Sequence, residues 1–459
     1  MSDIKSLWKS RLKQWECHIE EPSNENYWCP EWDTATPSKL TALHDEKLPL
    51  AISYLYEYSP FYRQLYQSHD IHPNDIHSMA DLTRLPIVTK NDMSRDVDAS
   101  PPWGNFTAVT DEEWNRNGWL MFATSGTTAR PRPFRYTKFD QEMWTWTDAR
   151  ALWSMGIRPG DRALLAFGYG PHVAMWGMHY ALNRMGVPIL PAGSWDTAAR
   201  AQAILTYHPS VIAATPSYAL NLAEVLRTKG VQPSQTSVRL IISLGEPLPP
   251  ATKNLIHDEW GAEVHQFWGC TEAAPSCGGY TCGNTIHIME DTHFIEVVDP
   301  DTLEPIEEGQ SGLVVLTNLC SEASPQVRFL VGDYATLSRK PCPCGRTHVH
   351  TDGFTGRADD MLNVRGVTVF PSAVEDIVRS FPELGYEFQI ILEKYGHRDV
   401  FRLQIEVLPG YEASSKGIAE KVSDSIRTNF DLGVKTEVLP WGTLPKTEFK
   451  AHRVKDLRK

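Results

Sequence analysis

Residues 121–136 read MFATSGTTARPRPFRY, the most informative stretch of the chain. Four hydroxyls and one glycine fill positions 124–128, and Arg130 and Arg132 follow them. Hydroxyls and free backbone N–H groups can surround phosphate oxygens, while arginines supply fixed positive charge. The spacing differs from that of the GxxxxGK[ST] phosphate loop. Taken alone, the segment leaves two interpretations open, a phosphate-binding loop and a polar surface turn.

The sequence downstream of this loop predicts an α/β sheet. Short apolar runs alternate with stretches of helical spacing: the apolar runs are 163–167, 187–190, 211–214 and 238–243, and the helical stretches are 173–185, 198–207 and 218–229. This alternation is typical of a largely parallel sheet covered by helices on both faces. Upstream, residues 47–69 predict two helices interrupted at Ser59-Pro60.

The pattern changes near Asp359. Residues 387–393 and 400–407 read as strands, 414–429 as an amphipathic helix and 434–439 as a further strand. A stretch of roughly 100 residues is enough for a separate small α+β domain. We therefore predict a large N-terminal domain, 1–358, and a small C-terminal domain, 359–459.

The charged residues of the sequence indicate which kinds of molecule the protein binds. Among 459 residues, Lys and Arg number 44 and Asp and Glu 57, which gives a net charge of −13. Such a surface repels phosphate backbones and anionic lipid, which argues against nucleic-acid or membrane partners and favours a small-molecule enzyme. The chain's beginning has no apolar signal core and no stretch is long enough to span a bilayer, so we expect a cytoplasmic protein.

Two later segments carry chemistry. Residues 244–248 (LGEPL) directly follow an apolar run, and open α/β sheets bind ligands at the carboxyl ends of their strands. An ordinary strand-to-loop turn is the alternative. Residues 267–272 (FWGCTE) place a carboxylate beside a hydroxyl, an arrangement that can hold Mg²⁺ together with phosphates.

In this order the segments resemble the adenylate-forming superfamily, and within it the phenylacetate-CoA ligases. The likeness covers nearly the whole chain and rests on these motifs: TSGTT at 124–128, GEPL at 245–248, WGCTE at 268–272, VGD at 331–333, GRADDM at 356–361 and LPKTEFK at 444–450. The resemblance implies a large N-terminal domain with doubly covered sheets and a small mobile C-terminal domain. It also implies an AMP-forming ligase, in which a carboxylic acid and Mg-ATP give an acyl-adenylate that passes to coenzyme A.

The resemblance assigns a role to each matching position. Three residues would be catalytic: Lys450, bridging the carboxylate and the α-phosphate, Thr271 at the α-phosphate, and Glu272 as the Mg²⁺ ligand. ATP would be bound by Thr124, Ser125, Gly126, Thr127 and Thr128 at the β- and γ-phosphates, Gly245, Glu246 and Pro247 against adenine, and Asp333 and Arg357 at the ribose. Asp359 matches the hinge, and Arg365 and Gly366 lie on a turn that would enter the site for thiol transfer.

The chain departs from the family pattern in two places. Ala129 stands where glycine is usual, and Leu330 and Val331 stand where Arg-Thr is usual, which removes a cation near the nucleotide. The second half-reaction is therefore in question. An adenylating amide synthetase or carrier-protein loader, with an amine or phosphopantetheine acceptor, is the alternative function. A non-catalytic relative is a third hypothesis, against which the intact Glu272, Asp333 and Lys450 argue.

A cysteine-rich segment suggests a metal. Residues 342–348 (CPCGRTH) resemble a run in phenylacetate-CoA ligases, some of which bind zinc there with an earlier cysteine and histidine. The matching ligands here are Cys282, His287, Cys342 and Cys344, and four such ligands suit a structural Zn²⁺. Cys277, Cys320 and His348 compete for the role, and reduced buried cysteines are the alternative.

The acyl pocket can also be placed by resemblance. It would hold Tyr169, His172, Trp176, Phe267 and Trp268. Flat aromatic walls favour a planar ring over a fatty chain, so we predict an aryl or arylacetic acid. The expected partners are thus a small carboxylic acid and CoA or another acyl acceptor, with a homodimer left open.

Overall fold

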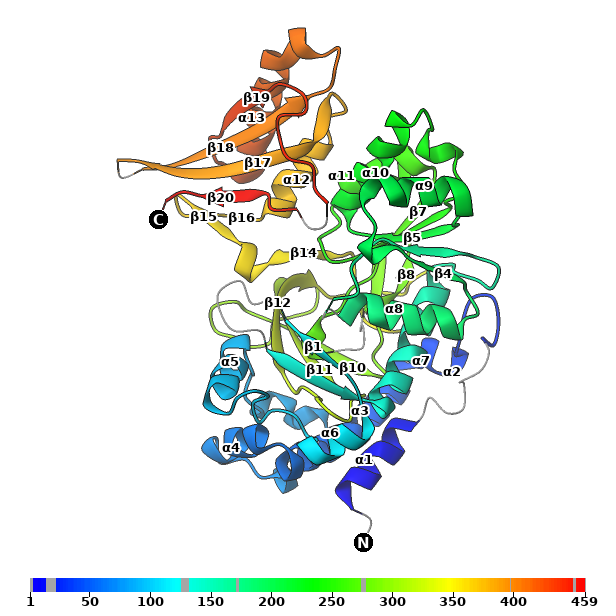
Figure 1. The fold of residues 1–459 in the computed structure, drawn as a ribbon. Coiled ribbons are helices and arrows are strands. Elements are labelled where there is room, and N and C mark those ends of the chain that lie inside the picture. The colour runs from blue at the N-terminus through cyan, green and yellow to red at the C-terminus, as the bar shows by residue number, and fades with distance from the viewer. Residues whose placement is uncertain are drawn as a thin grey trace. The chain divides into compact units, whose positions relative to one another are not determined.

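The computed structural model describes residues 3–13, 22–124, 132–170, 173–273, 278–396, 398–448 and 451–458. It divides into two compact units, each made of three stretches of chain (Figure 1). Unit 1 comprises Met1–Asp161, Gly168–Ile189 and Phe267–Gly353; unit 2 comprises Arg162–Phe167, Leu190–Gln266 and Phe354–Lys459. This partition differs from the domains 1–358 and 359–459, which stay a prediction.

Unit 1 begins with helices. They are α1 (Ile4–Leu12), α2 (Pro30–Asp33), α3 (Pro37–Tyr58), α4 (Pro60–Ser68), α5 (Lys90–Ala99), α6 (Asp111–Asn117), α7 (Lys138–Ser154) and α8 (Val173–Arg184). The predicted break at Ser59-Pro60 is confirmed. Proline forces the preceding residue out of the helical region, and Ser59 is extended, with φ −110° and ψ 109°. Its hydroxyl then accepts a hydrogen bond from the Tyr62 N–H and caps α4.

The strands of unit 1 form antiparallel pairs. They are β1 (Gly118–Ala123), β2 (Pro133–Thr137), β8 (Gly278–Cys282), β9 (Thr285–Ile288), β10 (His293–Val298), β11 (Ser311–Asn318), β12 (Phe329–Thr336) and β13 (His350–Thr351). β1 pairs with β2, β9 lies between β8 and β13, and β11 lies between β10 and β12.

Unit 2 contains the predicted parallel sheet, in the order β4-β3-β5-β6-β7. Its strands are β3 (Ala163–Leu165), β4 (Ile189–Pro191), β5 (Val211–Ala214), β6 (Leu240–Ser243) and β7 (Glu263–Gln266), and its helices are α9 (Thr197–Tyr207), α10 (Pro216–Thr228) and α11 (Pro250–Trp260). β3, β5, β6 and β7 pair in parallel, as the alternating pattern predicts. One buried core joins this sheet to the helices through residues such as Leu220, Ile241 and Ile256.

A second core lies in the C-terminal part of unit 2. The elements of this part are β14 (Phe354–Arg357), β15 (Leu362–Val364), β16 (Val367–Val369), α12 (Pro371–Arg379), β17 (Leu384–Tyr395), β18 (Arg398–Val407), α13 (Ser415–Phe430), β19 (Lys435–Leu439) and β20 (Val454–Asp456). The core itself takes its residues from β15 onward. A four-stranded sheet runs β19-β18-β17-β20, and α12 and α13 contribute Val374, Val422 and Ile426 to its core. The strands and helix predicted after residue 385 are thus confirmed. No helix in the described ranges is long and apolar enough to cross a membrane.

Candidate functional site

The predicted phosphate-binding loop joins β1 and β2. These strands pair antiparallel up to Ala123 and Pro133, and the Thr124 N–H donates to the Arg132 carbonyl at 3.1 Å, which fixes both ends of the loop. Ser125, Gly126, Thr127 and Thr128 lie outside the described residues, as do Ala129 and Arg130. Thr124 Oγ1 is buried and has no hydrogen-bond partner among the described residues. An unmatched buried hydroxyl at this position fits a phosphate oxygen as its partner.

The loop's base is tied to the Thr271-Glu272 turn. Arg132 donates to the Glu272 carboxylate at 3.0 Å, and both side chains are buried. From the same hairpin, the Tyr136 hydroxyl donates to the Thr271 carbonyl at 2.6 Å. The structure therefore brings Thr124, Thr271 and Glu272 to one region of unit 1. A carboxylate has two oxygens, so this ion pair and a magnesium ion can be held at once.

The predicted ribose residue is also in unit 1. Asp333, on β12, is buried and accepts a hydrogen bond from the Trp268 indole N–H at 2.9 Å. The resemblance assigns these two residues to different subsites, and the structure shows them in direct contact. Trp268 thereby orients the carboxylate while its ring, like that of Phe267, is buried.

Aromatic side chains of α8 contact Tyr169, one of the predicted acyl-pocket residues. The Tyr169 ring meets Trp176 edge-on at 5.2 Å, and its hydroxyl lies 3.0 Å from His179 Nδ1. Trp176 stacks with Tyr180 at 6.4 Å. Burial raises the pKa of Tyr169 to about 12 and lowers that of His179, so both are neutral near pH 7. His172 lies outside the described residues.

His179 and Tyr180 were missed by the sequence analysis. They stand three and four residues after Trp176 on one helix, and this spacing places side chains on a shared face. The helical pattern of residues 173–185 was therefore the signal that could have identified them.

The predicted adenine segment lies in unit 2, directly after β6. Gly245 has φ +81°, a left-handed conformation that glycine adopts readily. The Glu246 carboxylate accepts hydrogen bonds from the Ser217 N–H at 3.2 Å and the Ala451 N–H at 2.6 Å. Lys450 lies outside the described residues. The residue following it is thus bound to the segment that contains Pro247.

The remaining predicted residues of unit 2 lie on two short elements. Arg357 ends β14, and its guanidinium is 3.5 Å from Asp359 in the next turn. Arg365 and Gly366 have φ values of +54° and +82° between the paired Val364 and Val367, as in a two-residue hairpin turn. The turn is exposed, and Arg365 Nε donates to the Asp399 carbonyl at 2.8 Å.

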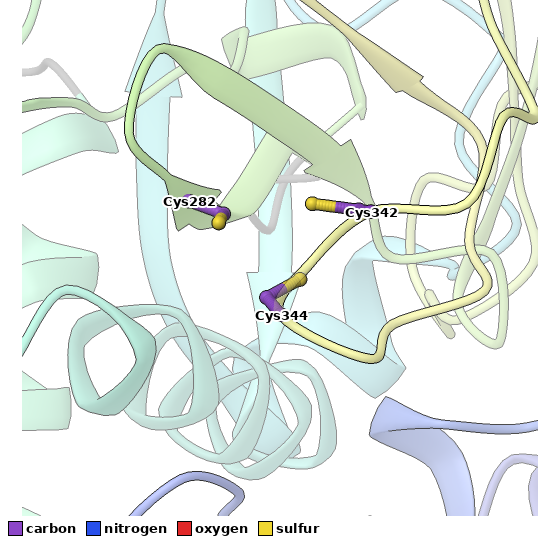
Figure 2. Close-up of side chains that lie close together, drawn as sticks. All are labelled: Cys282, Cys342 and Cys344. Carbon is purple, nitrogen blue, oxygen red and sulfur yellow. The ribbon is translucent and has the colours of Figure 1, made fainter.

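The predicted metal ligands are gathered in unit 1. The Cys282, Cys342 and Cys344 sulfurs lie within 4.8 Å of one another (Figure 2). His287 Nε2 is 3.4 Å from the Cys344 sulfur, and its Nδ1 lies 3.0 Å from the His348 carbonyl. A proton on Nδ1 leaves the Nε2 lone pair for a metal, the arrangement usual for ligating histidines.

The charges at this cluster suit a cation. Burial alone would raise the pKa of the Cys344 thiol, but contact with the His287 ring and the hydrogen bond from the Arg346 N–H lower it to about 6, whereas burial raises the pKa of the Cys342 thiol to about 12. A metal binds the thiolate rather than the thiol. Three sulfurs and one imidazole nitrogen form a suitable donor set for tetrahedral zinc.

The competing ligands are engaged elsewhere. His348 Nε2 lies 2.7 Å from the Trp32 carbonyl and its Nδ1 accepts from the Glu290 N–H. Cys320 is fully buried beside His293, at 3.9 Å. Cys277 lies outside the described residues. Among described residues, the structure gathers three of the predicted ligands, Cys282, Cys342 and Cys344, and places His287 beside Cys344.

Comparison with models of protein families shows which family the chain belongs to. The AMP-binding enzyme model matches residues 65–319, and the model for the AMP-binding enzyme C-terminal domain matches residues 366–458. The chain belongs to the AMP-binding enzyme family. This AMP-binding enzyme is 35% identical to the phenylacetate-coenzyme A ligase of Thermus thermophilus, over 94% of this chain and 99% of that one. It is 33% identical to the phenylacetate-coenzyme A ligase of Escherichia coli, over 93% and 97% of the two chains.

Solved structures agree. This chain matches the structure of 2-hydroxyisobutyryl-CoA ligase solved in its postadenylation state with 2-HIB-AMP. The TM-score is 0.89 and the sequence identity 28%, and the match covers 95% of this chain and 93% of that one. The predicted adenylate-forming fold and the likeness to the phenylacetate-CoA ligase branch are confirmed.

Proposed function

We propose that this enzyme is an AMP-forming acid–thiol ligase that activates an aromatic carboxylic acid with ATP and transfers it to coenzyme A. The observation that carries the proposal is the likeness to phenylacetate-CoA ligases over 94% of the chain. The joined rings of Tyr169, Trp176 and Tyr180 support an aromatic acid.

In the first step, a carboxylate oxygen of the acid attacks the α-phosphorus of ATP, and the bond to pyrophosphate breaks. Both reactants are anions, so the rate depends on alignment and charge neutralisation rather than on a covalent enzyme intermediate. Lys450 and Arg132 supply positive charge, and Thr271 contacts the α-phosphate. Glu272 would hold the Mg²⁺ of Mg-ATP, which would neutralise phosphate charge there.

Further residues hold the nucleotide for this step. Thr124 and the four residues after it bind the β- and γ-phosphates, and residues 245–247 pack on adenine. The Asp333 carboxylate, oriented by Trp268, accepts the ribose hydroxyls, and Arg357 reaches the same region.

In the second step, the deprotonated sulfur of CoA attacks the acyl carbonyl, and AMP leaves with the bonding electrons. Lys450 withdraws before this step through rotation at Asp359, and the turn of Arg365 and Gly366 approaches the site. A few residues at such a hinge can absorb a large change in φ and ψ.

A different acceptor is the second candidate function. Leu330 and Val331 lie on β12, where Val331 is fully buried and the Leu330 N–H donates to the Val88 carbonyl at 2.8 Å. These apolar side chains provide no cation near the nucleotide, which favours an adenylating amide synthetase or carrier-protein loader. Mass spectrometry of the products formed with CoA, amines or a phosphopantetheine carrier distinguishes the two functions.

The acid specificity gives a direct prediction. Because planar rings fit aromatic walls, acid-dependent ATP–pyrophosphate exchange with aryl or arylacetic acids should exceed that with long fatty acids by at least about tenfold. A panel of both classes at matched concentrations measures this ratio. A preference for long fatty acids contradicts the aromatic assignment.

We also propose that Cys282, His287, Cys342 and Cys344 hold a structural Zn²⁺. Protein purified without added metal should contain about one zinc per chain, because three gathered thiols and a nearby imidazole bind it tightly. Cys344→Ser should lose the metal and lower the melting temperature. Cys320→Ser, which changes a cysteine outside the cluster, is the matched control and should keep it. Less than about half an equivalent in the wild type removes the proposal.

The proposed function also bears on where in the cell the enzyme acts. The free thiols of Cys29 and Cys320 and the use of CoA support a cytoplasmic enzyme. Light scattering decides whether it forms the homodimer that the family likeness leaves open.

A further inference from the structure

Two hydrogen bonds flank position 450 from outside its own sheet. Asn221, on α10, donates from Nδ2 to the Thr447 carbonyl at 2.9 Å. Glu246, after β6, accepts from the Ala451 N–H at 2.6 Å. Asn221 is buried, so its bond is sheltered from competing water. Both residues belong to the parallel-sheet part of unit 2, whereas residues 447–451 lead into β20.

The same segment is also held by its own sheet. Glu387, on β17, accepts from the Thr447 N–H at 3.0 Å and from its hydroxyl at 3.2 Å, and it pairs with Arg453. Burial opposes ionisation of Glu387, but the Arg453 guanidinium lowers its pKa, so the carboxylate stays charged. One carboxylate therefore fixes the chain on both sides of position 450.

The outside contacts come largely from one face of α10. Ser217, Asn221 and Glu224 stand at positions i, i+4 and i+7, which lie on the same side of a helix. Ser217 Oγ lies 3.4 Å from the Arg453 guanidinium, and Glu224 pairs with Lys446 at 2.9 Å. These contacts are hydrogen bonds and an ion pair, and they lie beside an apolar contact, since Tyr386 of β17 packs against the core of the parallel sheet. Contacts between domains that separate and rejoin are more polar than permanent ones.

We propose that Asn221 and Glu246 are positioning residues that hold Thr447 and Ala451, on either side of position 450, in place for acyl-adenylate formation. The inference rests on the proposed function, in which Lys450 acts in the first step and withdraws before the second. The bonds from Glu387 accompany the segment throughout, because both partners belong to the C-terminal part of unit 2. The bonds from Asn221 and Glu246 exist only while the segment is docked, so their loss affects the first step alone.

Asn221→Leu tests this inference, because it keeps the side chain's approximate volume and removes its amide. Acid-dependent pyrophosphate release should fall about tenfold, the effect of losing one buried hydrogen bond that forms with the docked segment. Thioester formation from supplied acyl-adenylate and CoA should stay within about twofold of wild type. A residue with a merely structural role would change both half-reactions together.

The matched control is Asn429→Leu on α13. Asn429 also donates its amide to a backbone carbonyl, that of Ser425 at 2.8 Å, but it is exposed and makes this bond within its own helix. Both half-reactions should be unchanged in this variant. Asn221→Asp, which keeps the shape and removes the donor, serves as a second test should the leucine variant fail to fold.

Equal loss in both half-reactions, or no loss in either, overturns the inference. Failure of the proposed function is separate, because it would appear as absent acid-dependent pyrophosphate release in the wild type. If the wild type is active and Asn221→Asp leaves the ratio of the two half-reaction rates unchanged, the positioning role is refuted and the proposed function stands.

Discussion

Lys450→Ala is expected to lower acid-dependent pyrophosphate release by about 10²- to 10³-fold, the usual effect of removing one charge that stabilises a transition state. The resemblance assigns this residue to the bridge between carboxylate and α-phosphate. The structure adds that the chain on both sides of it is held, by Glu387, Asn221 and Glu246. A steady-state assay of pyrophosphate with a saturating aryl acid measures the loss.

Arg130→Ala is the comparison for this prediction. Arg130 belongs to the phosphate loop, where Arg132 and the loop's N–H groups share the task, so its loss should cost less, about tenfold. A larger loss for Arg130→Ala than for Lys450→Ala contradicts the assignment.

Arg150→Met is expected to reduce stability by about 3–5 kcal/mol, because it removes the guanidinium that pairs with two buried carboxylates. Arg150 donates to Asp33 at 2.9 Å and to Asp291 at 2.7 and 3.2 Å, and all three side chains are 0% exposed. Burial raises the pKa of Asp291, but Arg150 outweighs this and lowers it to about 2. The stability from this pair is therefore present above about pH 4 and lost as the pH falls toward 2.

Thermal unfolding at pH 7 measures the effect, with Arg116→Met as the control. Arg116 pairs with Glu112 one helical turn away, and their side chains are 64% and 85% exposed. Such a pair contributes roughly 0–1 kcal/mol. Equal shifts in melting temperature for the two variants would show that the buried pair is not a stabilising feature.

Local signals explain which parts of the fold could be predicted. Ser59-Pro60 encodes a helix break through the backbone of two residues, and the alternation in 400–407 encodes a strand with one buried face. β20 was missed, because its three residues are too few to show a period. It exists through parallel pairing of Val454 with Ile390 on β17, a contact that no local pattern records.

The candidate site divides in the same way. The metal ligands and the loop residues follow motifs that are contiguous in sequence, so the resemblance could assign them. Asp33, Arg150 and Asp291 have no such motif, since they meet only through the tertiary fold. The contact between Trp268 and Asp333 was missed for the same reason: each residue was recognised within its own motif, and motifs do not report which side chains touch.

The interleaved path of the chain has a consequence for synthesis. Unit 1 takes its last stretch from residues 267–353, after the parallel sheet of unit 2 has been made. During synthesis on the ribosome, the helices at the start of unit 1 therefore keep apolar faces exposed until β10, β11 and β12 have emerged. Nascent chains of this length are exposed to aggregation, and no single cut in the gene yields both units as separate products.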